Sequence, residues 1–134
     1  MAVTNDPIFA QTPLIGIATL TTPTAITSRA NITGTTGLVA LVATSTNGFR
    51  LDKITVKGKG TSLAGELFVW LYDGTTSYIY DEIDLTAVTG STTLASLLVT
   101  KTYTNVNLKA TTQSLYVSVS VQQDLNIFAH GGNY

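Results

Sequence analysis

The chain has 134 residues, of which 11% are charged, and its formal net charge is −1. This length fits one domain, which can bury roughly two-thirds of its unfolded surface without a disulfide or a metal site. The near-neutral charge and a pI near 5.6 exclude a protein that binds nucleic acid by electrostatic attraction. No apolar run reaches the roughly 18 residues of a membrane helix, so we expect no membrane partner.

The polar positions are filled mainly by Thr, Ser, Asn and Gln instead of charged residues. A surface of hydroxyl and amide groups gives up less side-chain entropy and hydration on contact than long charged side chains do. The composition therefore favours a protein that packs against copies of itself or a partner. The alternative is that the chain is rich in Thr simply because Thr suits β-strands.

The first residues form a separate segment. Met1–Pro13 holds two of the three prolines and indicates an extended arm. It lacks the basic and apolar regions of a secretory signal peptide, so we expect synthesis in a cytoplasm. Ile8 and Phe9 should pack against something, because burying a Phe side chain contributes about 2 kcal/mol. They either fold back across the open end of their own domain or reach a neighbouring subunit, and we favour the neighbour.

The remaining residues, 14–134, show period-two alternation in short runs that are separated by turn-forming residues. Asp73-Gly74 marks a tight turn and makes Gly65–Glu82 one β-hairpin. In Phe49–Lys57 the apolar phase slips, which predicts a bulge at Asp52-Lys53. The expected strands are Leu14–Leu20, Gly37–Thr44, Phe49–Lys57, Gly65–Asp73, Ser77–Tyr80, Leu94–Thr100, Asn105–Lys109, Leu115–Val121 and Leu125–His130.

Eight or nine short antiparallel strands without a helical stripe indicate an all-β, single-domain β-sandwich that is jelly-roll-like. Alternation places one set of side chains toward the core: Leu67, Val69, Leu71, Val117, Val119 and Val121. The opposite side of Leu115–Val121 should face solvent. Aromatic residues of the hairpin (Trp70, Tyr72, Tyr78 and Tyr80) are expected to fill one layer of the sandwich, although they could instead line a sugar-binding face.

The sequence offers little for catalysis. The single His130 precedes a Gly-Gly pair, but the Gly-x-Ser-x-Gly nucleophile elbow that accompanies such a run in esterases is missing. One His and no Cys do not make the usual zinc site. Asp81, Glu82 and Asp84 form the one acidic cluster. It could seed a cation site, but a solvated strand edge is the simpler interpretation. We therefore expect no enzyme activity, no cofactor and no metal.

Three segments resemble small virion structural proteins of tailed bacteriophages. They are Asn5–Phe9, Gly65–Gly74 and Asn126–Tyr134, so the resemblance extends along the whole chain. It depends on strand-like segments and a C-terminal signature, not on a catalytic motif. Membership of that group would imply a capsid cement, or decoration, protein: β-rich, often trimeric, located in the virion on the capsid surface and made in the host cytoplasm.

The leading hypothesis is thus a cement protein that forms a homo-oligomer, most often a trimer, and bridges subunits of the major capsid protein. The interface candidates are Ile8, Phe9, Tyr103 and Tyr134. The alternative is a carbohydrate- or host-receptor-binding module of a fibre or tail, which would use loop aromatics such as Tyr78, Tyr80 or Tyr103. A hydrolase is the third and weakest hypothesis.

Overall fold

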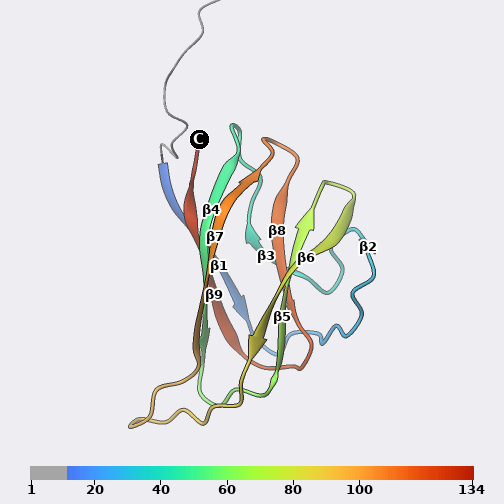
Figure 1. Cartoon of the computed structure of the whole chain (residues 1–134). Coiled ribbons are helices and arrows are strands. Elements are labelled where there is room, and N and C mark those ends of the chain that lie inside the picture. Colours follow the sequence, from blue (N-terminus) through green and yellow to red (C-terminus); the bar gives the residue numbers. More distant parts are fainter. Residues whose placement is uncertain (1–11) are drawn as a thin grey trace, which may run out of the picture.

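The computed structural model describes residues 12–134, which form nine strands and no helix. The strands are β1 (Thr12–Leu20), β2 (Ile32–Thr33), β3 (Val39–Val42), β4 (Phe49–Gly58), β5 (Gly65–Tyr72), β6 (Thr76–Leu85), β7 (Leu98–Leu108), β8 (Ser114–Val119) and β9 (Leu125–Asn133). They make a four-stranded sheet, β1-β9-β4-β7, and a five-stranded sheet, β2-β6-β5-β8-β3. The two sheets lie face to face (Figure 1). The predicted all-β sandwich is confirmed.

The strand pairs are nested along the chain. β5 pairs with β6, β4 with β7, β3 with β8 and β1 with β9, and every pair is antiparallel. The chain therefore behaves as one long hairpin whose halves run side by side. Two further pairs, β4 with β9 and β5 with β8, join these ribbons into the two sheets.

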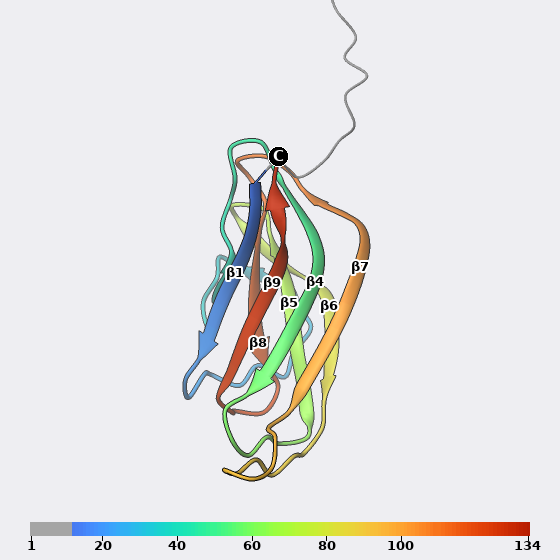
Figure 2. The same ribbon diagram turned by 90° about the vertical axis from the view of Figure 1, so that its left-hand side faces the viewer.

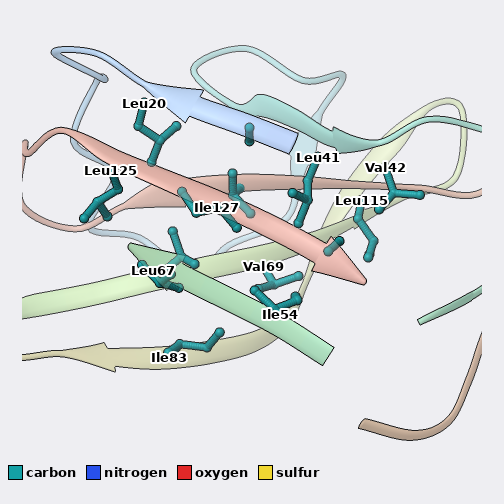
Figure 3. Close-up of a cluster of buried hydrophobic side chains, with 14 of the residues drawn as sticks. Leu20, Leu41, Val42, Ile54, Leu67, Val69, Ile83, Leu115, Leu125 and Ile127 are labelled. Atoms are coloured by element: carbon teal, nitrogen blue, oxygen red, sulfur yellow. The ribbon is translucent and has the colours of Figure 1, made fainter. Parts of the chain in front are cut away.

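The hydrophobic core lies between the sheets and takes side chains from both (Figure 3). Leu67 and Val69 of β5 and Val117 and Val119 of β8 are fully buried, as predicted. The prediction for Val121 is wrong, since it is 37% exposed. β8 ends at Val119, so the alternation that continues in the sequence no longer points into the core.

Two local predictions are confirmed. The β5–β6 turn contains Gly74 at a φ of 98°, and the carboxylate of Asp73 accepts hydrogen bonds from the backbone N–H groups of Thr75 and Thr76. Those bonds lower the pKa of Asp73 below its ordinary value. In β4 the register shifts between Leu51 and Lys53 against both neighbours, which is the expected bulge.

The strand boundaries differ in several places, and β2 was not expected. Leu94–Thr100 and Asn105–Lys109 are not two strands, because Leu98–Leu108 forms the continuous β7. The final strand continues to Asn133, so His130 is not at its end. At the other terminus β1 begins at Thr12, so the last two residues of the predicted arm belong to the sheet.

The sheets approach each other closely where β1 lies beside β3. A Cβ atom at Gly16 would stand 2.3 Å from the carbonyl oxygen of Leu41 and 3.1 Å from Val42. Only a residue without a side chain fits this contact. On the opposite side of the sandwich, β7 and β6 are joined by side chains instead.

Candidate functional site

The outer face of the five-stranded sheet is covered by the chain itself. Residues 21–38, which we call the strap, run from β1 to β3 across that face (Figure 1). Ile26 of the strap donates a backbone hydrogen bond of 2.9 Å to Val119, at the end of β8. Beneath the strap, Phe68 and Trp70 of β5 are buried although they point away from the inter-sheet core.

Arg29 anchors the strap. Its guanidinium forms ion pairs with Glu66 at 2.8 Å and with Glu82, and it lies over the Phe68 ring at 5.4 Å from the centroid. The hydrogen bond to Glu82 raises the pKa of Arg29 above its ordinary value. Glu82 of the acidic cluster therefore holds the strap, whereas Asp84 stays exposed, so the expectation of a solvated strand edge is wrong for Glu82.

The hairpin aromatics do not form one core layer. Trp70 is fully buried and donates a hydrogen bond of 2.9 Å from its indole N–H to Ser118, whereas Tyr78 and Tyr80 are 40% and 45% exposed. The aromatic rings are separated because the register between β5 and β6 shifts, which places Tyr78 opposite Leu71. Ser118 is itself buried, so the outer side of β8 does not face solvent as expected.

The outer face of the four-stranded sheet is bare. No segment of the described chain crosses it in Figure 2. Ile15 and Ile17 of β1 are 51% and 61% exposed there. Their partners across the β1–β9 register are His130 and Phe128, whose side chains share the face. We call this surface, centred on Ile15, Ile17 and Phe128, the open face.

His130 belongs to the open face. Its Nε2 atom lies 3.5 Å from the hydroxyl of Thr55 on β4. Within residues 12–134, no group of three or more His, Asp or Glu side chains is placed to hold a metal ion. In the same part of the chain there is no helix with the length and hydropathy to span a membrane.

A polar latch joins the sheets between β6 and β7. The carboxylate of Asp81 accepts hydrogen bonds from the Tyr103 hydroxyl at 2.6 Å and the Lys101 ammonium at 2.8 Å. Burial alone would raise the pKa of Asp81, but these donors and the Glu82 backbone N–H lower it overall. Burial and the adjacent Asp81 charge raise the pKa of Tyr103, so this residue stays a neutral donor.

A cavity of about 130 Å³ opens between the sheets near the end of β7. Its apolar wall consists of Leu71, Val106, Leu108 and Leu115. The remaining lining residues are uncharged and polar: Tyr80, Asn105, Asn107 and Gln113. The cavity therefore favours an uncharged group with one apolar side.

The predicted interface residues are scattered. Tyr103 lies in β7, not in a loop, and serves the latch. Tyr134 binds its own domain, since its backbone N–H donates to Gly48 at 3.1 Å and its hydroxyl donates to Asn107. Ile8 and Phe9 lie outside the described residues. Tyr78 and Tyr80, the candidate sugar-binding aromatics, are on strand β6 and not in a loop.

Sequence reasoning missed the strap, the latch and the open face. The signal for Arg29 was weak, because one cation in a Thr-rich segment does not reveal which carboxylates it meets. Ile15 and Ile17 carried a clearer signal: both are apolar and on the same side of an expected strand.

No protein-family model, curated protein or solved structure matches this chain.

Proposed function

We propose that the protein is a non-catalytic structural domain that associates with copies of itself through its open face, as a capsid cement protein of a tailed bacteriophage. The observation that carries this proposal is the difference between the two outer faces. One is covered by the strap, whereas the other leaves Ile15 and Ile17 51% and 61% exposed. Apolar side chains gathered on a sheet face mark an interaction surface.

The strand order supports a jelly roll as the finer description of the sandwich. Without the two-residue β2, the eight strands pair first with last, second with seventh, third with sixth and fourth with fifth. That nesting is what results when a long hairpin is rolled into two sheets. Jelly rolls occur in viral capsid proteins and in lectins. The topology is therefore compatible with a cement protein and with a sugar-binding module, and it decides between neither.

A second copy is the occupant that the charges favour for the open face. Lys53 and Lys57 of β4 share that face, since they pair with His130 and Asn126 of β9. The outer side of the five-stranded sheet carries Glu66, Glu82 and Asp84 around Arg29. One face is therefore basic and the other acidic. Contacts between unlike faces generate a ring where the rotation between copies closes and an open filament where it does not, and a closed ring of three copies is the trimer that we propose.

On a capsid, binding of this ring to the shell would stabilise the shell by mass action. A ring that binds the assembled shell and its major capsid protein, but not free subunits, stabilises the shell by the free energy of that binding. With 11% of residues charged, a large hydroxyl- and amide-rich contact can form with little unpaired charge. We place the protein on the virion surface for this reason.

Light scattering on the purified full chain tests self-association. We expect the mass of a homo-oligomer for the natural chain and a shift toward monomer for Ile17→Glu, which puts a carboxylate in the open face. Leu94→Glu is the matched control, because Leu94 is 62% exposed but lies outside the sheets. A monomeric natural chain, or equal behaviour of the two variants, would contradict the proposal.

A carbohydrate- or host-receptor-binding module is the second candidate. It is favoured by Tyr78 and Tyr80, which are exposed on β6, because exposed aromatic rings can stack on sugars. Binding to host-cell glycans that is lost in a Tyr78→Ala, Tyr80→Ala double variant would support this function. Retained binding in that variant would exclude these two residues as the sugar platform.

A further inference from the structure

We propose that the cavity beside the end of β7 receives the side chain of Phe9 from a second copy of this chain. The inference rests on the proposed self-association and specifies one of its contacts.

The size of the cavity suits one aromatic ring. A dry cavity of about 150 Å³ lined by Leu, Ile and Phe side chains binds benzene, and the cavity beside β7 measures about 130 Å³. Leu71, Val106, Leu108 and Leu115 supply its apolar wall. No charged side chain lines it, so a phenyl ring could enter without leaving a buried charge unpaired.

The polar residues of the cavity suit the backbone of an extended segment. The amide of Asn105 has no hydrogen-bond partner among the described residues, and Gln113 uses only its Oε1 atom, which accepts from Lys109 N–H at 2.7 Å. These amide groups remain free to bind the N–H and C=O groups next to an inserted side chain. Phe9 lies two residues after Pro7, and a nearby proline lowers the entropy that an extended segment loses on binding.

The chain's own Phe9 is poorly placed to reach this cavity. Thr12 of β1 is the first described residue. It pairs with Asn133 of β9, which pairs with Phe49 of β4, which in turn pairs with Leu108 of β7. This path crosses three strand spacings, about 14 Å. The three residues from Thr12 back to Phe9 span at most about 11 Å, so the Cα atom of the chain's own Phe9 cannot stand at Leu108, and its side chain would have to cover the remaining distance along the ends of the strands.

The direct path is also blocked. Tyr134 and Gly48 lie along the ends of the strands between β9 and β7: a Cβ at Gly48 would be 2.8 Å from the Leu108 carbonyl and 3.6 Å from the Tyr134 ring. The Tyr134 hydroxyl reaches Asn107 at the cavity. A segment from a neighbouring copy can approach from the open side of β7, which has no strand partner beyond it among the described residues.

Disulfide trapping tests the contact, and the absence of Cys from the chain makes the experiment clean. Ala10→Cys places a thiol beside Phe9 without removing the ring, and Tyr80→Cys places one at the cavity, where the natural residue is 45% exposed. The two single variants are mixed under mild oxidation, and mixed dimers are identified by mass. Leu98→Cys, at the far end of β7 and 64% exposed, replaces Tyr80→Cys in the control.

We expect mixed dimers of Ala10→Cys with Tyr80→Cys at about tenfold the yield of the Leu98→Cys control. Equal yields would overturn the inference, as would a disulfide closed within one chain when Ala10→Cys and Tyr80→Cys are combined. Phe9→Ala should weaken self-association about tenfold in light scattering, whereas Thr4→Ala should not. If the chain forms an oligomer but no disulfide is trapped, only the Phe9 contact is contradicted. If the chain is a monomer, the proposed function is contradicted as well.

Discussion

The Tyr103 hydroxyl of β7 donates a hydrogen bond of 2.6 Å to the Asp81 carboxylate of β6, which ties the two sheets together along one edge. At the opposite edge the sheets meet through backbone, where Gly16 lies against the carbonyl of Leu41. One edge of the sandwich thus depends on a polar contact between side chains, and the other on the absence of a side chain. The polar edge leads to the first two predictions.

Removing the Tyr103 hydroxyl should destabilise the fold. Tyr103→Phe keeps the ring but leaves the carboxylate with one donor fewer, and we expect a loss of about 1–2 kcal/mol in the free energy of unfolding. Tyr116→Phe is the control, because its hydroxyl has no hydrogen-bond partner among the described residues; it should change stability by less than about 0.5 kcal/mol. Urea unfolding measures both, and equal effects would mean that the latch contributes nothing.

The same latch predicts a pH dependence. The pKa of Asp81 is lowered in the folded chain, so the folded state binds fewer protons than the unfolded state, whose Asp pKa is about 3.9. Its stabilisation is therefore present above about pH 4 and lost as the pH falls through the folded-state pKa. The stability difference between the natural chain and Asp81→Asn should shrink as the pH falls from about 5 to about 2. A constant difference over that range would contradict the assignment.

The strap can be followed through Trp70, the single tryptophan of the sequence, which is fully buried beneath it. Arg29→Ala removes both ion pairs and the contact with Phe68, so the strap should open more often. We expect a red shift of the tryptophan emission and faster hydrogen exchange at the Ile26 N–H. Arg50→Ala is the matched control, since Arg50 pairs with Asp52 on the other sheet. A strap unaffected by Arg29→Ala would show that other contacts hold it.

Two valines of one sequence run test the boundary of the core. Val119 is fully buried and Val121 is 37% exposed, although both have the same phase in the alternating segment. Val119→Ala should cost about 1–3 kcal/mol, and Val121→Ala less than about 0.5 kcal/mol. Chemical denaturation distinguishes them, and similar losses would place Val121 in the core after all.

Local features of the fold could be predicted from the sequence. The Asp73-Gly74 turn and the β4 bulge were predictable because each depends on neighbouring residues: a positive φ at Gly74 and a slip in the apolar phase after Leu51. It was not predictable that Leu98–Leu108 forms one continuous strand. Its middle contains Asn105 at a φ of 59° and a register shift between Thr102 and Val106, and such an irregularity interrupts the alternation without ending the strand.

The candidate surfaces were harder to foresee, for a physical reason. Whether an outward-facing residue is exposed depends on which distant segment covers it. Phe68 and Ile17 are both apolar residues on the outer sides of strands, yet the strap covers Phe68 and nothing in the described chain covers Ile17. Period-two alternation assigns residues to a face of the sheet, but it does not say which outer face a connecting segment will cross.

The most direct test of the proposed function is a particle reconstruction of the virion that contains this protein. We predict many copies of the two-sheet domain on the outer surface of the shell, grouped in threes, with the open face of each copy, marked by Ile15 and Ile17, turned toward a neighbouring copy. A reconstruction that places the domain in a few copies at a fibre or tail tip, or that leaves the open face in solvent, would contradict the proposed function.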